Sequence, residues 1–344
     1  MSTRLTFIIL LITCVRCAID KERALKFLSD GDTAMNSDID IARKAYLRAL
    51  TLDPCLSPAF DKLGQISMKK KRFTEAAGFF TKAIECLPGS ISYHVNRAYA
   101  YYELNQPGKA MSDIQFVIKR EPTTTKAYHV QSLIAIKMND LNSALDFSSK
   151  CISLDQNNVE FYVTRARVYY LMKKLSESEA DLNSASQLKN NEPEIFNQMA
   201  MINISKGRFD DALNQVQAAL KLSNDNPYYL NNRGYILLSQ NKLPEALEDI
   251  TKSINLDSDN AYAYRNWGIY YYLTGSFESA IWNFDRSIKL DSYVEKVHFY
   301  RGMSYLRTGR NSLACDDFKQ SEKEGDHMLT IDLLKPCRGK KVGG

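Results

Sequence analysis

The sequence predicts an all-helical protein in which one unit of two helices is repeated along the chain. From Arg23 to Met328 the 344-residue chain aligns with itself in rows of 34 residues, without an insertion or deletion. Within each row, apolar residues recur three and four positions apart, as on one face of a helix. Asn or Gly recurs where the first helix of a row must end. Nine such rows cover 306 residues. Length alone would suggest two domains, but the rows predict one array of repeats.

Small residues allow the two helices of each row to approach closely. The twentieth position of the row is Ala in all rows but one: Ala42, Ala76, Ala110, Ala144, Ser178, Ala212, Ala246, Ala280 and Ala314. The eighth position is Gly, Ala or Ser in rows two to nine. Large residues such as Phe60, Phe73 and Phe80 in row two are expected to fill the space between helices. Row one instead carries Lys26 and Asp30 at an aromatic and a small position, as expected of a terminal row without a neighbour.

The fifteenth position marks the turn between the two helices of a row. Asn and Gly tolerate the left-handed conformation that closes a helix. They occupy this position in six rows: Asn105, Asn139, Gly207, Asn241, Gly275 and Gly309. We therefore expect a helix to end near each of these residues and no helix to run through two of them.

Together these positions resemble the tetratricopeptide repeat, whose pattern places aromatic, small, aromatic, Ala, aromatic, Ala and Pro residues at the same points. The resemblance covers nine repeats over residues 23–328. It implies an all-α, right-handed α-solenoid in which the first helix of each row, the A helix, lines a concave groove. It also implies a non-enzymatic scaffold that binds a protein or peptide segment in this groove.

The chain continues for sixteen residues after the last row. Residues 329–344 begin with an apolar stretch that we expect to form a capping helix over row nine, because the end of a solenoid needs a cover. The stretch is Leu329, Ile331, Leu333 and Leu334. A basic tail follows, with Lys335, Arg338, Lys340 and Lys341.

The N-terminal residues predict a targeting segment. Leu5–Val15 is an apolar run behind Arg4, too short to span a bilayer, and small residues follow it. Residues 1–17 are therefore predicted to be a signal peptide, and the chain to be secreted or held in the cell envelope, periplasmic or lipid-anchored. Leu11–Cys14 also resembles a lipobox, in which Cys14 would carry a lipid and provide the only membrane contact. The alternative is an ordinary N-terminal helix of a cytosolic protein. No ER-retention signal ends the sequence.

Composition and motifs argue against several other classes of protein. The net charge of +5 is dispersed, whereas nucleic-acid binding demands a clustered basic face. No nucleophile, phosphate-binding or metal-ligand motif is present, so we expect neither catalysis nor a cofactor. Seven cysteines are too few for a disulfide-based fold. A bond between Cys315 and Cys337, across row nine and the cap, stays open.

A correlation within the rows predicts ion pairs. The seventh position, on the A helix, is Arg in rows three, five, seven and nine, and the twenty-third position, on the second helix, is Asp in those same rows. We expect four pairs within rows: Arg97 with Asp113, Arg165 with Asp181, Arg233 with Asp249, and Arg301 with Asp317. The alternative is a ladder of arginines that binds anions.

The A helices of rows seven to nine carry the best candidates for a binding site. In the repeat family, positions 2, 5, 9 and 12 face the groove. Here they supply aromatic residues together with an Arg and an Asn, a composition typical of binding hot spots. The predicted peptide-binding residues are Tyr228, Asn231, Tyr235, Tyr262, Arg265, Tyr272 and Phe299. Tyr99 and Tyr102 in row three are the second choice.

The sequence does not identify the partner. Repeats that bind chaperone tails carry a Lys, Asn, Asn, Lys, Arg clamp, and rows two to four match only two of these five residues, Asn96 and Lys126. A chaperone-tail adaptor is therefore disfavoured. The alternatives to an extracytoplasmic scaffold are a recruiting or regulatory subunit of a separate enzyme, and a cytosolic adaptor.

Overall fold

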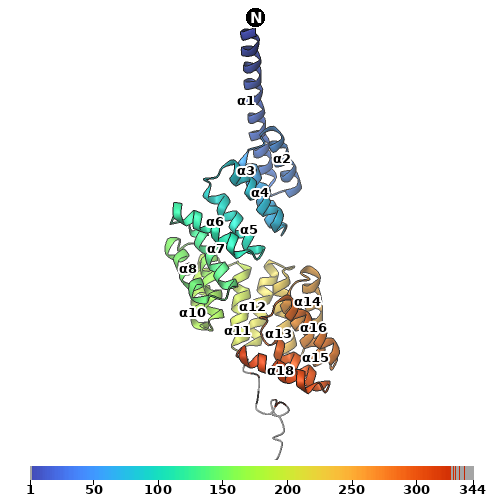
Figure 1. The fold of residues 1–344 in the computed structure, drawn as a ribbon. Helices are drawn as coiled ribbons and strands as arrows, with labels where there is room; N and C mark the ends of the chain where they lie inside the picture. Colours follow the sequence, from blue (N-terminus) through green and yellow to red (C-terminus); the bar gives the residue numbers. More distant parts are fainter. Residues whose placement is uncertain (1, 327, 329, 331–332, 334–336, 338–344) are drawn as a thin grey trace, which may run out of the picture. The chain divides into compact units, whose positions relative to one another are not determined.

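The computed structural model describes residues 2–326, 328, 330, 333 and 337, with side chains from residue 18 onward. Over this part of the chain the regular secondary structure is eighteen α-helices and no strand (Figure 1). The chain forms two compact units, residues 1–172 and 173–344, which divide in the turn of row five. The predicted all-α class is confirmed, and so is the pairing of helices within rows one to four and six to nine.

Unit 1 contains the helices of rows one to four and the A helix of row five. Successive helices pack against one another, and A helices of neighbouring rows, such as α5 and α7, also meet. The helices are α1 (Ser2–Ala34), α2 (Ile39–Leu52), α3 (Ser57–Lys69), α4 (Phe73–Cys86), α5 (Ile91–Glu103), α6 (Pro107–Arg120), α7 (Thr125–Lys137), α8 (Leu141–Leu154) and α9 (Val159–Leu171).

Unit 2 contains the second helix of row five and both helices of rows six to nine. Its A helices are α11, α13, α15 and α17, of which α13 lies beside α15 and α15 beside α17. The helices are α10 (Leu175–Leu188), α11 (Pro193–Ser205), α12 (Phe209–Leu222), α13 (Pro227–Ser239), α14 (Leu243–Leu256), α15 (Ala261–Leu273), α16 (Phe277–Leu290), α17 (Val297–Arg307) and α18 (Asn311–Lys323).

Every turn within rows two to nine has a residue with positive φ at the fifteenth position. The six predicted residues adopt this conformation, with φ between 56° at Asn105 and 81° at Gly275. Lys71 and Lys173 adopt it as well in rows two and five, although lysine carries a Cβ that disfavours it. The turn prediction is confirmed, and the geometry of the repeat imposes this backbone conformation even on residues that do not favour it.

Row one departs from the predicted alignment by one residue. The small residue that contacts the second helix is Gly31, whose Cα faces the Tyr46 ring, and not Asp30, which is exposed. Phe27 likewise packs against the core in place of Lys26. The shift arises in the turn between α1 and α2, because row one has no residue in the left-handed conformation at that turn. The amides of Ser37 and Asp38 instead bond to the carbonyl of Ala34.

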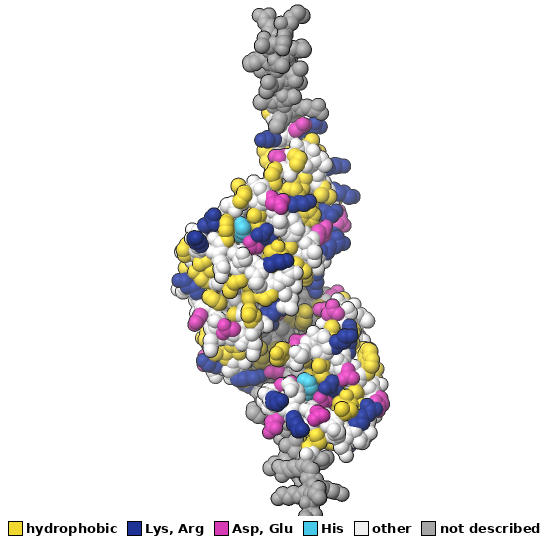
Figure 2. Space-filling view, viewed as in Figure 1, with side chains coloured by type: hydrophobic (Ala, Val, Ile, Leu, Met, Phe, Trp, Pro, Cys, Tyr) yellow, Lys and Arg dark blue, Asp and Glu magenta, His cyan; other side chains and the backbone are white. Residues whose placement is uncertain are grey.

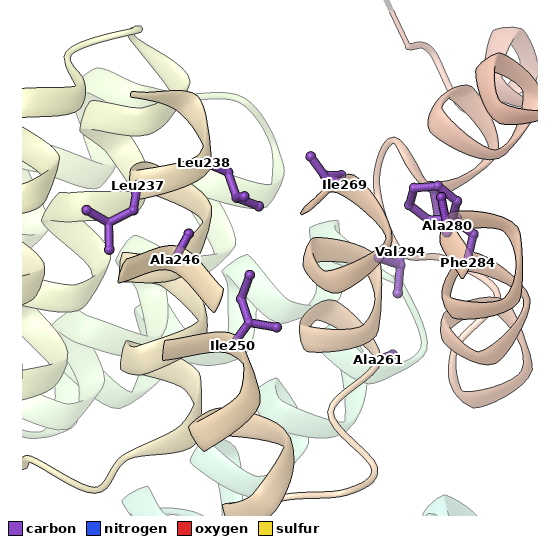
Figure 3. Packing of buried hydrophobic residues seen from close by; sticks show 10 residues of the cluster. Leu237, Leu238, Ala246, Ile250, Ala261, Ile269, Ala280, Phe284 and Val294 are labelled. Carbon is purple, nitrogen blue, oxygen red and sulfur yellow. The ribbon is translucent and has the colours of Figure 1, made fainter. Parts of the chain in front are cut away.

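The core is made by large side chains of the second helices set against small residues of the A helices. The rings of Phe80, Phe284 and Phe318 lie directly on Gly64, Gly268 and Gly302, where a Cβ atom would collide with them. Figure 3 shows part of the largest cluster, in which Leu237 and Ile250 come from row seven and Ile269 and Phe284 from row eight. On the surface shown in Figure 2, basic and acidic side chains are interspersed.

Three of the four predicted Arg–Asp pairs are present. Each arginine donates from Nε and Nη2 to both oxygens of its aspartate at 2.6–2.8 Å. The pairs are Arg97–Asp113, Arg233–Asp249 and Arg301–Asp317. These arginines are structural, and the anion-binding alternative is wrong for them. Arg165 and Asp181 belong to different units, and their pairing stays a prediction.

Two disulfides are formed among the cysteines that the structure describes. The bond between Cys315 and Cys337, left open by the sequence, is formed and ties the chain after row nine to α18. The bond between Cys55 and Cys86 was not expected. It joins the residues just before α3 to the last residue of α4, so it closes row two on itself. Cys151 is free and buried, and burial raises the pKa of its thiol to about 12.

Removing the Cys55–Cys86 bond should destabilise unit 1. A disulfide that closes a loop of 31 residues restricts the unfolded chain, and its loss typically costs about 2–5 kcal/mol. Cys55→Ser with Cys86→Ser should lower the free energy of unfolding by about 3 kcal/mol in urea titrations followed by circular dichroism. Dithiothreitol should then have a smaller effect on this variant than on the wild type. Equal stabilities of variant and wild type without reductant would contradict the prediction.

The two ends of the chain are described only in part. α1 runs from Ser2 to Ala34, but the predicted signal peptide and the lipobox cysteine Cys14 lie among residues whose side chains are not described. The predicted capping helix and basic tail lie almost wholly outside the described residues. Among the helices open to inspection, none is both long and apolar enough to cross a membrane.

Candidate protein-binding face

Caps built into the sequence position the A helices of rows seven and eight. Asn226 accepts hydrogen bonds from the amides of Tyr228 and Tyr229, and Pro227 begins α13 with the φ angle that a helix requires. Asn260 caps α15 in the same way through the amide of Ala263. The two helices therefore start in register. Their predicted binding residues form, together with Lys296, what we call the A-helix face: Tyr228, Tyr235, Tyr262, Arg265, Tyr272 and Lys296.

Arg265 lies at the centre of this face and is 8% exposed. Its guanidinium donates to the side-chain oxygen of Asn266 at 2.8 and 3.0 Å and to the backbone oxygen of Glu295 at 3.2 Å. The rings of Tyr235 and Tyr262 lie 5.0 and 5.4 Å from it, within the range of a cation–π contact. Its hydrogen-bond acceptors within the described chain are an amide and a carbonyl oxygen, and it forms no ion pair there.

A chain of asparagines supports the face from below. Asn266 donates to the side-chain oxygen of Asn231 at 2.7 Å, and Asn232 donates to Asn197 at 2.8 Å, which links α15 to α13 and α13 to α11. Asn231 is only 3% exposed. The structure therefore places this predicted binding residue beneath the face, where it orients Asn266 and, through it, Arg265.

The aromatic residues of the predicted site differ in exposure: some lie on the surface and others pack beneath it. Tyr228 and Tyr262 are exposed, and Tyr235 and Tyr272 are half-buried. Phe299 is buried and packs edge-on against Tyr300. Tyr272 contacts Tyr300 and Phe277 at ring distances of 5.9 Å. Burial, followed by the nearby Tyr235, raises the pKa of Tyr300 to about 12, so its hydroxyl stays protonated at neutral pH.

The segment before α17 departs from the pattern of the two preceding A helices. Val294 occupies the position at which Asn226 and Asn260 cap the two preceding A helices, and it is buried in the core instead (Figure 3). Without a cap, α17 starts only at Val297, and Lys296 takes a left-handed conformation with φ 64°. The sequence signal for this change was the absence of an Asn at Val294, directly before row nine.

The segment before α17 places the charged residues Glu295 and Lys296 next to residues of rows five and seven. Lys296 Nζ donates to the hydroxyl of Tyr235 at 3.1 Å, two rows back along the chain. The carboxylate of Glu295 accepts from Lys173 Nζ, in the turn of row five, at 2.9 Å. Burial raises the pKa of Glu295, but the hydrogen bond and charge of Lys173, then the charges of Arg265 and Lys296, outweigh it and leave that pKa lowered.

The second-choice residues lie in unit 1. The rings of Tyr99 and Tyr102 stack 5.8 Å apart, and the ammonium of Lys137 lies 5.0 Å from the Tyr102 ring. A small pocket of about 50 Å³ lies beside Tyr102, lined also by Ile134, Lys137 and Met138. This site has less exposed aromatic surface than the A-helix face and no buried cation of its own.

Comparison with solved structures supports the fold. The chain resembles a protein in the crystal structure of the APC/C hetero-tetramer Cut9–Hcn1, with a TM-score of 0.71 at 17% identity over 87% of this chain and 59% of that one. It also resembles a tetratricopeptide repeat protein from Parabacteroides merdae, with a TM-score of 0.59 at 17% identity over 72% of this chain and 99% of that one. At these identities the likeness shows the fold alone.

Sequence comparison adds relatives of much greater length. Hsp70–Hsp90 organizing protein 3 of Arabidopsis thaliana is 24% identical over 44% of this chain and 28% of its own length. The mitochondrial import receptor subunit TOM70 of Homo sapiens is 22% identical over 51% of this chain and 30% of its own. The matches thus span less than a third of either relative.

Two segments of the chain match known repeat profiles. Sequence profiles described as tetratricopeptide repeat match residues 125–158 and 198–261, which are rows four and six to seven of the alignment. The helix pairs, the small-on-large packing and the left-handed turns recur in the same places outside the matched segments. Together with the helical-repeat fold of the structural neighbours, these findings support a tetratricopeptide repeat protein.

Proposed function

We propose that this protein is a non-enzymatic, extracytoplasmic scaffold that binds an extended segment of a partner protein on the A-helix face. The observation that carries the proposal is the arrangement around Arg265. A buried cation lies between two tyrosine rings, with the further tyrosine Tyr228 exposed on the neighbouring helix. Tyrosine and arginine contribute most to binding when they lie together near the centre of an interface. An extended segment suits a face built from parallel rows, because it can contact several A helices in turn.

Two independent features support a location outside the cytosol. One is the predicted signal peptide at residues 1–17. The other is the pair of disulfides, since such bonds persist in oxidising compartments and are rare in reducing ones. One of these bonds closes row two, and the other fixes the chain that follows row nine.

The names of several relatives suggest chaperone binding, but the corresponding residues do not. In rows two to four, Asp61 occupies the first Lys position of the chaperone-tail clamp. Its carboxylate accepts hydrogen bonds from Asn96 at 2.8 Å and from Gln65 at 2.7 Å. An acidic group at this point repels a carboxylate ligand. We therefore assign the partner to the A-helix face of unit 2 and not to rows two to four.

Replacing two tyrosines of the face should weaken partner binding strongly. The probe is a dodecapeptide selected on the wild-type chain from a random displayed library, with Kd measured by isothermal titration calorimetry. Tyr235→Ala with Tyr272→Ala should cost roughly 2 kcal/mol or more, about thirtyfold in Kd, with helicity unchanged. The matched control is Trp282→Ala with Tyr293→Ala, two exposed aromatic residues of unit 2 outside the face. The control should bind like the wild type, and loss of binding in the control alone would contradict the proposal.

A further inference from the structure

Three cations from different rows lie near the carboxylate of Glu295, beside the A-helix face, and their charges lower its pKa. Lys173 lies in the turn of row five, Arg265 in α15 and Lys296 just before α17. Glu295 pairs with Lys173 through its side chain and accepts from Arg265 through its backbone oxygen. Among the described acidic groups next to these helices, Asp257 and Glu194 accept from the hydroxyls of Tyr228 and Tyr229, and Asp326 accepts from Ser321. Positive charge therefore exceeds negative charge at this point.

Arg265 is the strongest indication that this face binds an anion. A buried guanidinium is costly unless acceptors surround it, and a carboxylate is the acceptor that best matches its planar set of donors. Arg265 has only an amide oxygen and a carbonyl oxygen as acceptors within the described chain. Its ring contacts with Tyr235 and Tyr262 leave its charge in place.

Building on the proposed function, we propose that the A-helix face recognises carboxylate groups of its partner, and that Glu295 is an internal competitor for the same cations. In the free protein the Glu295 side chain neutralises part of the cluster. Because this side chain is 58% exposed and its Lys173 partner 70%, the ion pair is weak and salt-sensitive. Val294 fixes the backbone of the segment in the core, so the side chain can leave while the Glu295 carbonyl stays on Arg265.

If Glu295 competes with the ligand, removing its charge should strengthen peptide binding. The probe is a fluorescein-labelled peptide of alternating Glu and Ala with an amidated C-terminus, measured by fluorescence anisotropy. Removing the competing charge in Glu295→Gln should tighten its binding roughly threefold, whereas Lys296→Gln and Arg265→Gln should weaken it, the latter about tenfold. Arg265→Lys, which keeps the charge, should weaken it less. Glu278→Gln makes the same change in net charge on α16, where Glu278 pairs with Arg310 away from the face, and should have no effect.

Two further peptides identify the source of the carboxylate. A Gln–Ala peptide with an amidated end should bind weakly, and the same peptide with a free C-terminus reports on a terminal carboxylate. If the Gln–Ala peptide with a free C-terminus binds tightly, the cations recognise the carboxylate of a chain end. If it binds as weakly as the amidated Gln–Ala peptide, they recognise acidic side chains. Unchanged or weaker binding in Glu295→Gln would overturn the competitor. Equal binding of the Glu–Ala and both Gln–Ala peptides would overturn carboxylate recognition, yet the proposed function would survive if the library-selected peptide still depends on Tyr235 and Tyr272.

Discussion

Replacing Asp113 with alanine should lower the free energy of unfolding by about 3–5 kcal/mol, because two buried donors would lose their acceptor. Asp113 accepts from Arg97 Nε and Nη2 at 2.8 and 2.7 Å and from the His94 ring at 2.8 Å. The side chains of all three residues are mostly buried. Water cannot readily replace the lost carboxylate, so the guanidinium keeps its charge without compensation.

The control for this prediction is Asp146→Ala in the same unit. Asp146 lies on α8 and is exposed, so its removal should change stability by less than about 0.5 kcal/mol. Urea denaturation followed by circular dichroism measures both variants. Similar stabilities for the two variants would mean that the Arg97–Asp113 pair contributes little net stability. In that case, the recurrence of this pair in alternate rows would need a reason other than folding.

Replacing Phe284 with alanine should cost about 3–5 kcal/mol. Its ring is fully buried, lies on Gly268 and stacks against Tyr300 at a centroid distance of 6.3 Å. Because Gly268 has no side chain to move into the space, the backbone must shift or a cavity must remain. The same loss should weaken the support of the A-helix face, since Tyr300 also contacts Tyr272.

Trp282 on the same helix is the matched control for Phe284. It is 60% exposed, so Trp282→Ala removes a larger side chain with less than about 0.5 kcal/mol of effect. Thermal unfolding by circular dichroism compares the two variants directly. A larger loss of stability in the Trp282 variant than in the Phe284 variant would contradict the packing described for rows eight and nine.

The periodic features of the fold could be predicted from sequence because every row reports on them independently. The turn at Asn105 and the pair Arg97–Asp113 each depend on local spacing within one row. Row one and row nine are different, because their ends depend on single residues that the period does not describe. Ser37 makes a different turn in row one, and Val294 replaces a helix cap before row nine. Both departures shift or shorten an A helix.

The sequence predicted which residues of the candidate site come together but not which of them are exposed. The row alignment selected Tyr235, Tyr262 and Arg265, which do come together. It could not separate the exposed Tyr228 from the buried Asn231, because both lie at positions assigned to one face. The contact between Lys173 and Glu295 joins residues 122 positions apart and depends on how rows five to nine stack. No local pattern encodes such a contact.

The cysteines show a similar limit. Cys55 and Cys86 lie 31 residues apart, slightly less than one row. Because the second helix of a row returns the chain toward its start, cysteines at this separation come within 5.3 Å between their Cα atoms. The general rule about cysteine number gave no hint of this bond, whereas the row geometry could have suggested it.

The most direct test of the account is the affinity of one library-selected dodecapeptide for three proteins: the wild type, Tyr235→Ala with Tyr272→Ala, and Trp282→Ala with Tyr293→Ala. The account predicts a loss of about thirtyfold in the first variant and none in the second, with equal helicity in all three. Equal affinities for all three proteins would place the binding site away from the A-helix face, and the pair Tyr99 and Tyr102 in unit 1 would be the next site to examine.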